Sequence, residues 1–187
     1  MRKVFFGVIC SLLFAACNNE KKEGTEPAST TASPAAETKS GGNELLPMSE
    51  ADAAKAGMEA FAKGDMDGMT ANYDDNILYR WSSGDSLNGK KAVADYYKGR
   101  WALIDSFSYS DQIFLPVMVK EQQSKYQRLG KWVLSWSFAH VKYKNGKKLD
   151  FWTHGVSHYN DAGKVDYIGQ YLDRHPIMEA TKDLMKK

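Results

Sequence analysis

The chain has 187 residues and a mass of 21.0 kDa, which is room for one domain of typical size with tails. Its 43% apolar and 12% aromatic residues exclude a fully disordered chain, because they can fill a core. The formal net charge of +2 falls to zero once Arg2 and Lys3 leave with the N-terminal segment described next, so a strongly basic nucleic-acid binder is excluded.

The first 16 residues have the pattern of a secretory signal peptide. Residues 1–3 are a short basic start, and residues 4–14 are an apolar run too short to remain as a membrane span. Ala15 and Ala16 are the small residues that favour cleavage by a signal peptidase. We therefore expect residues 1–16 to be a signal peptide.

Cys17 follows directly, and the segment Phe14-Ala15-Ala16-Cys17 resembles the lipobox of bacterial lipoproteins, with Phe14 in place of the usual leucine. The resemblance implies that the Cys17 thiol takes a diacylglycerol and anchors the mature chain in a membrane. Each buried methylene adds about 0.8 kcal/mol, so several acyl chains hold durably. We expect a lipid-anchored protein of the bacterial cell envelope, outside the cytoplasm on the periplasmic or cell-surface side. The alternative is an ordinary secreted protein cut after Ala16.

Residues 17–44 are expected to be the lipidated cysteine and a disordered tether. The segment after Cys17 is rich in Ser, Thr, Pro, Ala, Gly and Glu and has no aromatic or large aliphatic residue, so it cannot bury enough surface to order itself. The only other cysteine, Cys10, lies in the signal peptide. The domain that we expect over residues 45–187 therefore has no thiol chemistry and no disulfide.

Three helices are expected at the start of this domain. Ser49 is placed to cap the first helix, with Asp52 three residues on. Its apolar residues repeat at helical spacing: Ala54, Met58 and Phe61. A second, short helix is expected from Asp65, with one apolar face: Met66, Met69 and Tyr73. The third helix runs from Gly89 to about Trp101.

The period of the pattern then changes to two, which predicts strands. We expect a strand over residues 77–81, a loop over 82–88, and further strands over 113–119, 131–144, 148–159 and 164–173. Asn145-Gly146 predicts a two-residue hairpin loop, because both positions of such a turn need positive φ. Pro176 favours the start of a C-terminal helix. Helices followed by an antiparallel meander indicate an α+β fold.

Several segments resemble the NTF2-like superfamily, which includes the SnoaL-like proteins and ketosteroid isomerase. The segments are FAKGDMDGM at 61–69, YDD at 73–75, GKKAV at 89–93 with YY at 96–97, and YNDAGKV at 159–165. The resemblance implies a cone, with three N-terminal helices packed on a curved antiparallel sheet. These motifs are turns and core positions, so they predict the fold and not an activity.

The Asn145-Gly146 turn also predicts which side chains face the cavity of such a cone. If Lys144 pairs with Lys147, then Trp136 lies opposite Gly155 and both point to the same side. That face alternates large and small residues and leaves hollows, so we assign it to the cavity. It carries Trp132, Leu134, Trp136, Phe138, His140, Phe151, Thr153, Gly155, Ser157 and Tyr159. On the last strand the resemblance favours Ile168, Gln170 and Leu172.

The expected ligand-binding residues follow from this assignment: Trp81, Tyr97, Trp136, Phe138, His140, Thr153 and Gln170. The proton transfer of ketosteroid isomerase is excluded, because ungapped matching places its base, tyrosine and acid on Trp81, Gly57 and Gly155. His140 is the residue that would act if the domain were catalytic, since imidazole titrates near neutral pH. The pair His154 and His158 lies on a strand, where four residues span about 13 Å, so one ion cannot bridge it.

We therefore expect a membrane-tethered domain that binds a small, partly apolar molecule without catalysis, metal or cofactor. Two alternatives stay open. One is a SnoaL-like enzyme of unknown reaction that uses His140 with Tyr97 or Trp81. The other is a protein-interaction module, because this fold often dimerises through the outer face of its sheet. A homodimer of that kind would bury Trp152, His154, Val156 and His158.

Overall fold

The computed structural model describes residues 42–125 and 127–185. The expected signal peptide, Cys17 and nearly all of the expected tether lie outside the described residues. The first described element is the short strand β1 (Glu44–Leu45), which reaches one residue into the segment expected to be tether. Among the described residues, no helix is both long enough and apolar enough to pass through a bilayer.

The N-terminal helices differ from the prediction in how they begin. A 3-10 turn η1 (Met48–Ala51) follows Pro47, and α1 (Asp52–Ala62) starts only after it, without a side-chain cap. The predicted Ser49 cap is therefore wrong. The predicted apolar face is confirmed, because Ala54, Met58 and Phe61 all pack against the core. α2 (Met66–Met69) begins as predicted, where the Asp65 carboxylate accepts from the Gly68 N–H at 2.8 Å.

Tyr73 does not continue α2 but begins β2 (Tyr73–Trp81), four residues before the predicted strand. Its N–H donates to the Thr70 carbonyl oxygen at 3.0 Å, so the chain turns before it can add a further helical residue. Part of the predicted loop is also a strand, β3 (Ser86–Asn88), which pairs antiparallel with β2. α3 (Lys90–Trp101) follows Gly89 as expected.

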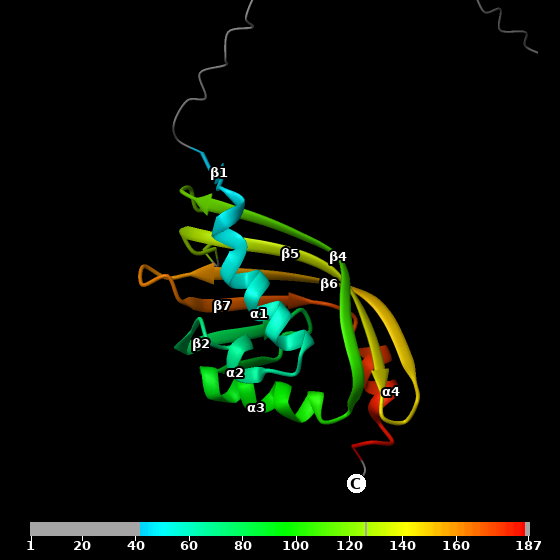
Figure 1. Ribbon diagram of the computed structural model, residues 1–187. Coiled ribbons are helices and arrows are strands. Elements are labelled where there is room, and N and C mark those ends of the chain that lie inside the picture. The colour runs from blue at the N-terminus through cyan, green and yellow to red at the C-terminus, as the bar shows by residue number, and fades with distance from the viewer. Residues whose placement is uncertain (1–41, 126, 186–187) are drawn as a thin grey trace, which may run out of the picture. The chain divides into compact units, whose positions relative to one another are not determined.

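The strands form one seven-stranded sheet in the order β1-β4-β5-β6-β7-β2-β3. Its central meander is antiparallel and consists of β4 (Ile104–Val119), β5 (Gly130–Tyr143), β6 (Lys148–Tyr159) and β7 (Val165–Tyr171). The sheet is not antiparallel throughout, because β2 pairs with β7 in the parallel direction. α1 crosses one face, and β4, β5 and β6 bend strongly toward α4 (His175–Thr181), where Pro176 lies in the first turn as expected (Figure 1).

β4 begins nine residues before the predicted strand and contains a bulge between Ser110 and Ile113. The missed half alternates polar and aromatic residues, and the bulge interrupts that alternation before the apolar half begins. Asp111 within the bulge has a φ of 49°, the only positive φ among described residues other than glycine. Bulges of this kind increase the local twist and bend of a strand, which agrees with the bend of β4 in Figure 1.

The hairpin of β5 and β6 has a three-residue loop rather than the predicted two-residue loop. The Tyr143 N–H donates to the Lys147 carbonyl oxygen at 2.9 Å, and among the loop residues only Gly146 has a positive φ, of 84°. The pairing therefore shifts by one residue, so Trp136 lies opposite His154, and Ser135 lies opposite Gly155. A shift of one residue turns every side chain of a strand to the other face. The predicted facing of β5 is wrong and that of β6 is right.

Candidate functional site

A cavity of about 450 Å³ lies between the helices and the inner face of the bent sheet. Four of the predicted binding residues line it: Trp81, Tyr97, Thr153 and Gln170. The predicted inward facing of Ile168 and Leu172 is confirmed as well. Trp136, Phe138 and His140 do not line the cavity, because the shifted hairpin turns them to the outer face. β5 instead presents small residues to the cavity: Ser135, Ser137 and Ala139.

A chain of hydrogen bonds crosses one wall of the cavity and links β2, α3, β6 and β7. The Tyr79 hydroxyl donates to Gln170 Oε1 at 3.2 Å, and the Gln170 amide donates to Thr153 Oγ1. The Tyr97 hydroxyl lies 2.5 Å from the Tyr79 hydroxyl. Because the single proton of Tyr79 goes to Gln170, Tyr97 is the donor in that contact. The chain therefore runs from Tyr97 to Thr153, whose own hydroxyl proton remains to be donated.

Gly155 gives the Gln170 amide the room that this chain needs. A Cβ at position 155 would lie 3.1 Å from Ser135 Oγ and 3.4 Å from Gln170 Oε1. Gly155 is thus a position of close approach in the cavity wall.

Buried phenols are the main polar feature of the cavity. Burial raises the pKa above the ordinary value for four of them: Tyr73, Tyr79, Tyr97 and Tyr109. Burial, aided by the nearby Glu50 carboxylate, also raises the pKa of Tyr159 to about 12. At neutral pH these groups are therefore uncharged and available as hydrogen-bond donors.

Two hydroxyls in the cavity wall are buried without a hydrogen-bond partner among the described residues. They are Ser137 Oγ and the Tyr159 hydroxyl, on residues that are 1% and 4% exposed. A buried polar group that lacks a partner costs about 1–3 kcal/mol, so each favours an occupant that can accept its proton.

No Asp, Glu or His is among the described residues that line the cavity. The three positions at which the ketosteroid isomerase groups would fall, Trp81, Gly57 and Gly155, do line it. The excluded chemistry would therefore have been in the right place, but its residues are different. The charged side chains of the lining are Arg100 and Arg174.

His140 lies on the outer face in a polar cluster. Its Nδ1 is 2.8 Å from Asp150 Oδ1, and its Nε2 is 3.0 Å from Ser110 Oγ. This is the order of groups in a serine nucleophile site, but Ser110 Oγ also donates to Asp111 Oδ2 at 3.0 Å. The side chains of His140 and Asp150 are 41% and 62% exposed, so water reaches both. We assign this cluster to fastening β4, β5 and β6 beside the bulge.

The two histidines of the HxxxH pair also lie on the outer face, and each has other partners. His154 Nδ1 is 2.9 Å from the Ser135 carbonyl oxygen, and its ring stacks between Trp136 and Tyr171. His158 is 8% exposed and lies between Asp166 Oδ1, at 2.5 Å, and the Leu129 carbonyl oxygen, at 2.8 Å. Within the described ranges, no three metal-binding side chains gather in a way that could hold an ion.

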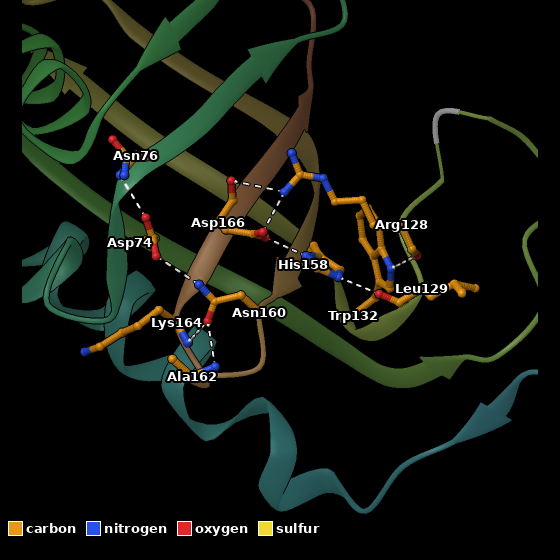
Figure 2. Close-up of polar contacts among 10 residues, drawn as sticks. All are labelled: Asp74, Asn76, Arg128, Leu129, Trp132, His158, Asn160, Ala162, Lys164 and Asp166. Carbon is orange, nitrogen blue, oxygen red and sulfur yellow. Dashed lines mark hydrogen bonds and ion pairs between the residues drawn. The ribbon is translucent and has the colours of Figure 1, made fainter.

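Figure 2 shows that His158 belongs to a network holding the β4–β5 connection against β7. Arg128 Nη1 pairs with Asp166 Oδ2 at 2.7 Å, and the Trp132 indole donates to the Arg128 carbonyl oxygen at 2.9 Å. Nearby, Asn160 Nδ2 donates to Asp74 Oδ2 at 2.9 Å and fastens the β6–β7 turn to β2. These contacts stabilise one end of the sheet and supply no group to the cavity.

Sequence reasoning missed several residues of the site. Tyr79 lies two residues before Trp81 on a strand, so alternation alone could have placed it on the cavity side. Tyr109 could have been found only if the first half of β4 had been recognised as a strand. Ser137 was hidden by the one-residue shift of the hairpin.

Comparisons with known proteins identify the fold. No family model matches the chain, and no curated protein matches it. A proposed polyketide cyclase from Xanthomonas campestris pv. campestris is similar in structure, with a TM-score of 0.56 at 16% identity over 70% of this chain and 94% of that chain. An NTF2-like protein of unknown function from Burkholderia pseudomallei has a TM-score of 0.53 at 13% identity over 70% and 95%. An LEH-like epoxide hydrolase from M. tuberculosis has a TM-score of 0.53 at 18% identity over 72% and 91%.

At these identities the likeness shows the fold alone. The mixed seven-stranded curved sheet with its few helices fits an NTF2-like cone, as the sequence motifs predict.

Proposed function

We propose that the domain of residues 45–187 holds a small, partly apolar molecule in the cavity without transforming it. The observation that carries the proposal is the cavity of about 450 Å³, lined by rings and hydroxyls, with no carboxylate or imidazole among its described lining residues. Volumes of this size suit small organic ligands. General acid–base catalysis needs a titratable group within reach of the substrate, and here the nearest-neutral groups, the phenols, have a raised pKa.

The comparisons support a cavity used for organic molecules. Two of the similar proteins have names that refer to organic substrates, a polyketide and an epoxide. Those activities stay with those proteins, because the shared feature is the fold.

The proposed location is the outside of a bacterial membrane, with attachment through lipid on Cys17. The apolar run, the small residues and the cysteine at positions 4–17 support this. A Cys17→Ser chain tests it. The substituted chain should move from the membrane fraction to the soluble fraction, whereas equal membrane association of the two chains would contradict the lipid anchor.

Native mass spectrometry of the purified full chain tests the binding function. We expect a retained molecule that is released on unfolding and that is lost in a Ser157→Phe chain. Ser157 lines the cavity on β6, so the added ring would fill space that the ligand needs. Ser108→Phe makes the same change at an exposed position on β4 and should retain the molecule. Equal retention by both variants would place the ligand elsewhere.

A homodimer through the outer sheet face is a second candidate, as a companion to binding. The observation that favours it is the exposure of large side chains on that face: Ile113 at 56%, Trp152 at 55% and Tyr171 at 48%. Apolar side chains grouped in this way mark interaction surfaces. A second copy suits the face, because a two-fold contact would set uncharged rings against the same rings. Sedimentation should show a dimer that a Trp152→Ser chain loses, and a monomer at every concentration would contradict it.

A further inference from the structure

The cavity has charge of only one sign around it. Among the described residues that line the cavity, the charged side chains are Arg100 on α3 and Arg174 before α4, and none is acidic. Cavity linings that desolvate a charge favour a ligand of the opposite sign and reject one of the same sign.

Arg174 is held in place and largely neutralised. Its Nη1 pairs with Asp85 Oδ2 at 2.7 Å and lies 3.3 Å from Ser83 Oγ, while its guanidinium lies 4.8 Å from the centre of the Trp81 ring. A guanidinium fixed over an indole keeps further N–H groups for another partner. Its net charge is nevertheless balanced by Asp85.

Arg100 is the lining charge without an acidic partner in the described part of the chain. Its hydrogen bond there is from Nη1 to the Met185 sulfur at 3.9 Å, and a thioether is a weak acceptor. Arg100 lies in the last turn of α3, close enough to Tyr143 for its charge to oppose the rise in the pKa of that phenol caused by burial. Tyr143 also lines the cavity, which places the unbalanced charge beside the wall.

The neutral polar groups of the cavity are donors as well. The hydrogen-bond chain through Gln170 leaves the Thr153 proton unassigned, and the hydroxyls of Ser137 and Tyr159 are buried without partners among described residues. Their protons can be satisfied by ligand oxygens that accept hydrogen bonds. The rest of the lining is mostly rings and aliphatic side chains.

We propose that the cavity selects a small organic carboxylate with an apolar, ring-bearing body, whose anionic end lies at Arg100. This inference rests on the proposed binding function and names the class of its ligand. A carboxylate accepts hydrogen bonds at both oxygens and pairs with a guanidinium in a matched planar geometry. An amine of the same shape would lose its water without gaining a counter-charge.

Calorimetric titration of the full chain with three probes of one shape tests the proposal: 2-naphthoate, 2-naphthamide and 2-naphthylmethylammonium. We expect 2-naphthoate to bind best, the amide to bind about tenfold more weakly, and the ammonium not to bind. Arg100→Gln should weaken 2-naphthoate about tenfold and leave the amide unchanged. Lys98→Gln removes the same charge from the same helical turn at an exposed residue outside the lining, and should change neither.

The outcomes separate the two proposals. If the three probes bind equally, or if Arg100→Gln and Lys98→Gln act alike, the preference for an anion is wrong while the binding function stands. If no probe binds and native mass spectrometry also finds no retained molecule, both proposals are wrong.

Discussion

Individual polar side chains in this domain differ in what they hold in place. Tyr79 is 4% exposed and is the middle member of the chain that runs from Tyr97 through Gln170 to Thr153. His140, which the sequence placed in the cavity, is instead part of a half-exposed cluster on the outer face. The same type of change at these two positions should therefore have different consequences.

Replacing Tyr79 by Phe should destabilise the domain. The change leaves Gln170 Oε1 and the Tyr97 hydroxyl without their partner, which costs about 1–3 kcal/mol in the free energy of unfolding. Urea denaturation measures this difference. Tyr171→Phe is the matched control at a residue that is 48% exposed, and it should stay within about 0.5 kcal/mol of the unchanged chain. Equal effects of the two changes would show that the Tyr79 contacts contribute nothing.

Replacing His140 by Ala should leave ligand binding unchanged. The residue does not line the cavity, so the affinity for 2-naphthoate should match that of the unchanged chain within error. The free energy of unfolding should fall by about 1 kcal/mol, because hydrogen bonds to Asp150 and Ser110 are lost at partly exposed positions. A loss of binding without a loss of stability would return His140 to the site.

At the scale of elements, the hairpin loop decides which side chains the cavity receives. An Asn-Gly pair suits a two-residue loop with positive φ at both residues, and it equally suits a three-residue loop with positive φ at the glycine alone. Both loops flank the same alternating strands, so the local pattern could not choose between them. Packing of β5 against β4 and β6 selects the longer loop.

The size of the side chains also misled the assignment of faces. Large rings suggest a cavity wall that can stack a ligand, but a hollow exists only where side chains are small. Ser135, Ser137 and Ala139 leave that space, while Trp136 and Phe138 fill the outer face. By contrast β6, Tyr97 and the last strand were placed correctly, because their facing did not depend on that loop.

Gly146→Ala should destabilise the hairpin. Its φ of 84° lies in the left-handed region, where a Cβ costs about 1–2 kcal/mol. Gly99→Ala is the control with the opposite sign, since a Cβ there meets open space within α3 and a helical Gly→Ala change gains about 0.5–1 kcal/mol. Urea denaturation of the two variants should shift in opposite directions. Equal stability of Gly146→Ala and the unchanged chain would argue against the three-residue loop.

For the domain as a whole, the buried phenols set its behaviour in alkali. Burial raises the folded-state pKa of Tyr73, Tyr97 and Tyr109, and that of Tyr159 to about 12. Unfolded tyrosines titrate near pH 10. The contribution of the neutral phenols to stability is therefore complete below about pH 10 and is lost as the pH rises toward the folded-state values.

We expect the urea midpoint to hold steady from about pH 8 to 10 and then to fall, with the phenolate absorbance appearing together with unfolding. In strong denaturant the same absorbance should appear near pH 10 for every tyrosine. Phenolate that forms near pH 10 in the folded chain, at full amplitude and without loss of stability, would contradict the burial of these rings.

The account depends most on which side of β5 faces the cavity, and thiol labelling measures this directly. Residues 42–185 contain no cysteine, so Ser137→Cys and Phe138→Cys each introduce one thiol into the domain. Ser137 is 1% exposed and lines the cavity, whereas Phe138 lies on the outer face. With the unchanged chain as background, a maleimide should label the thiol at 138 about a hundredfold faster than the thiol at 137, because thiol reactions depend on access. Faster labelling at 137 would restore the two-residue loop and would contradict the cavity described here.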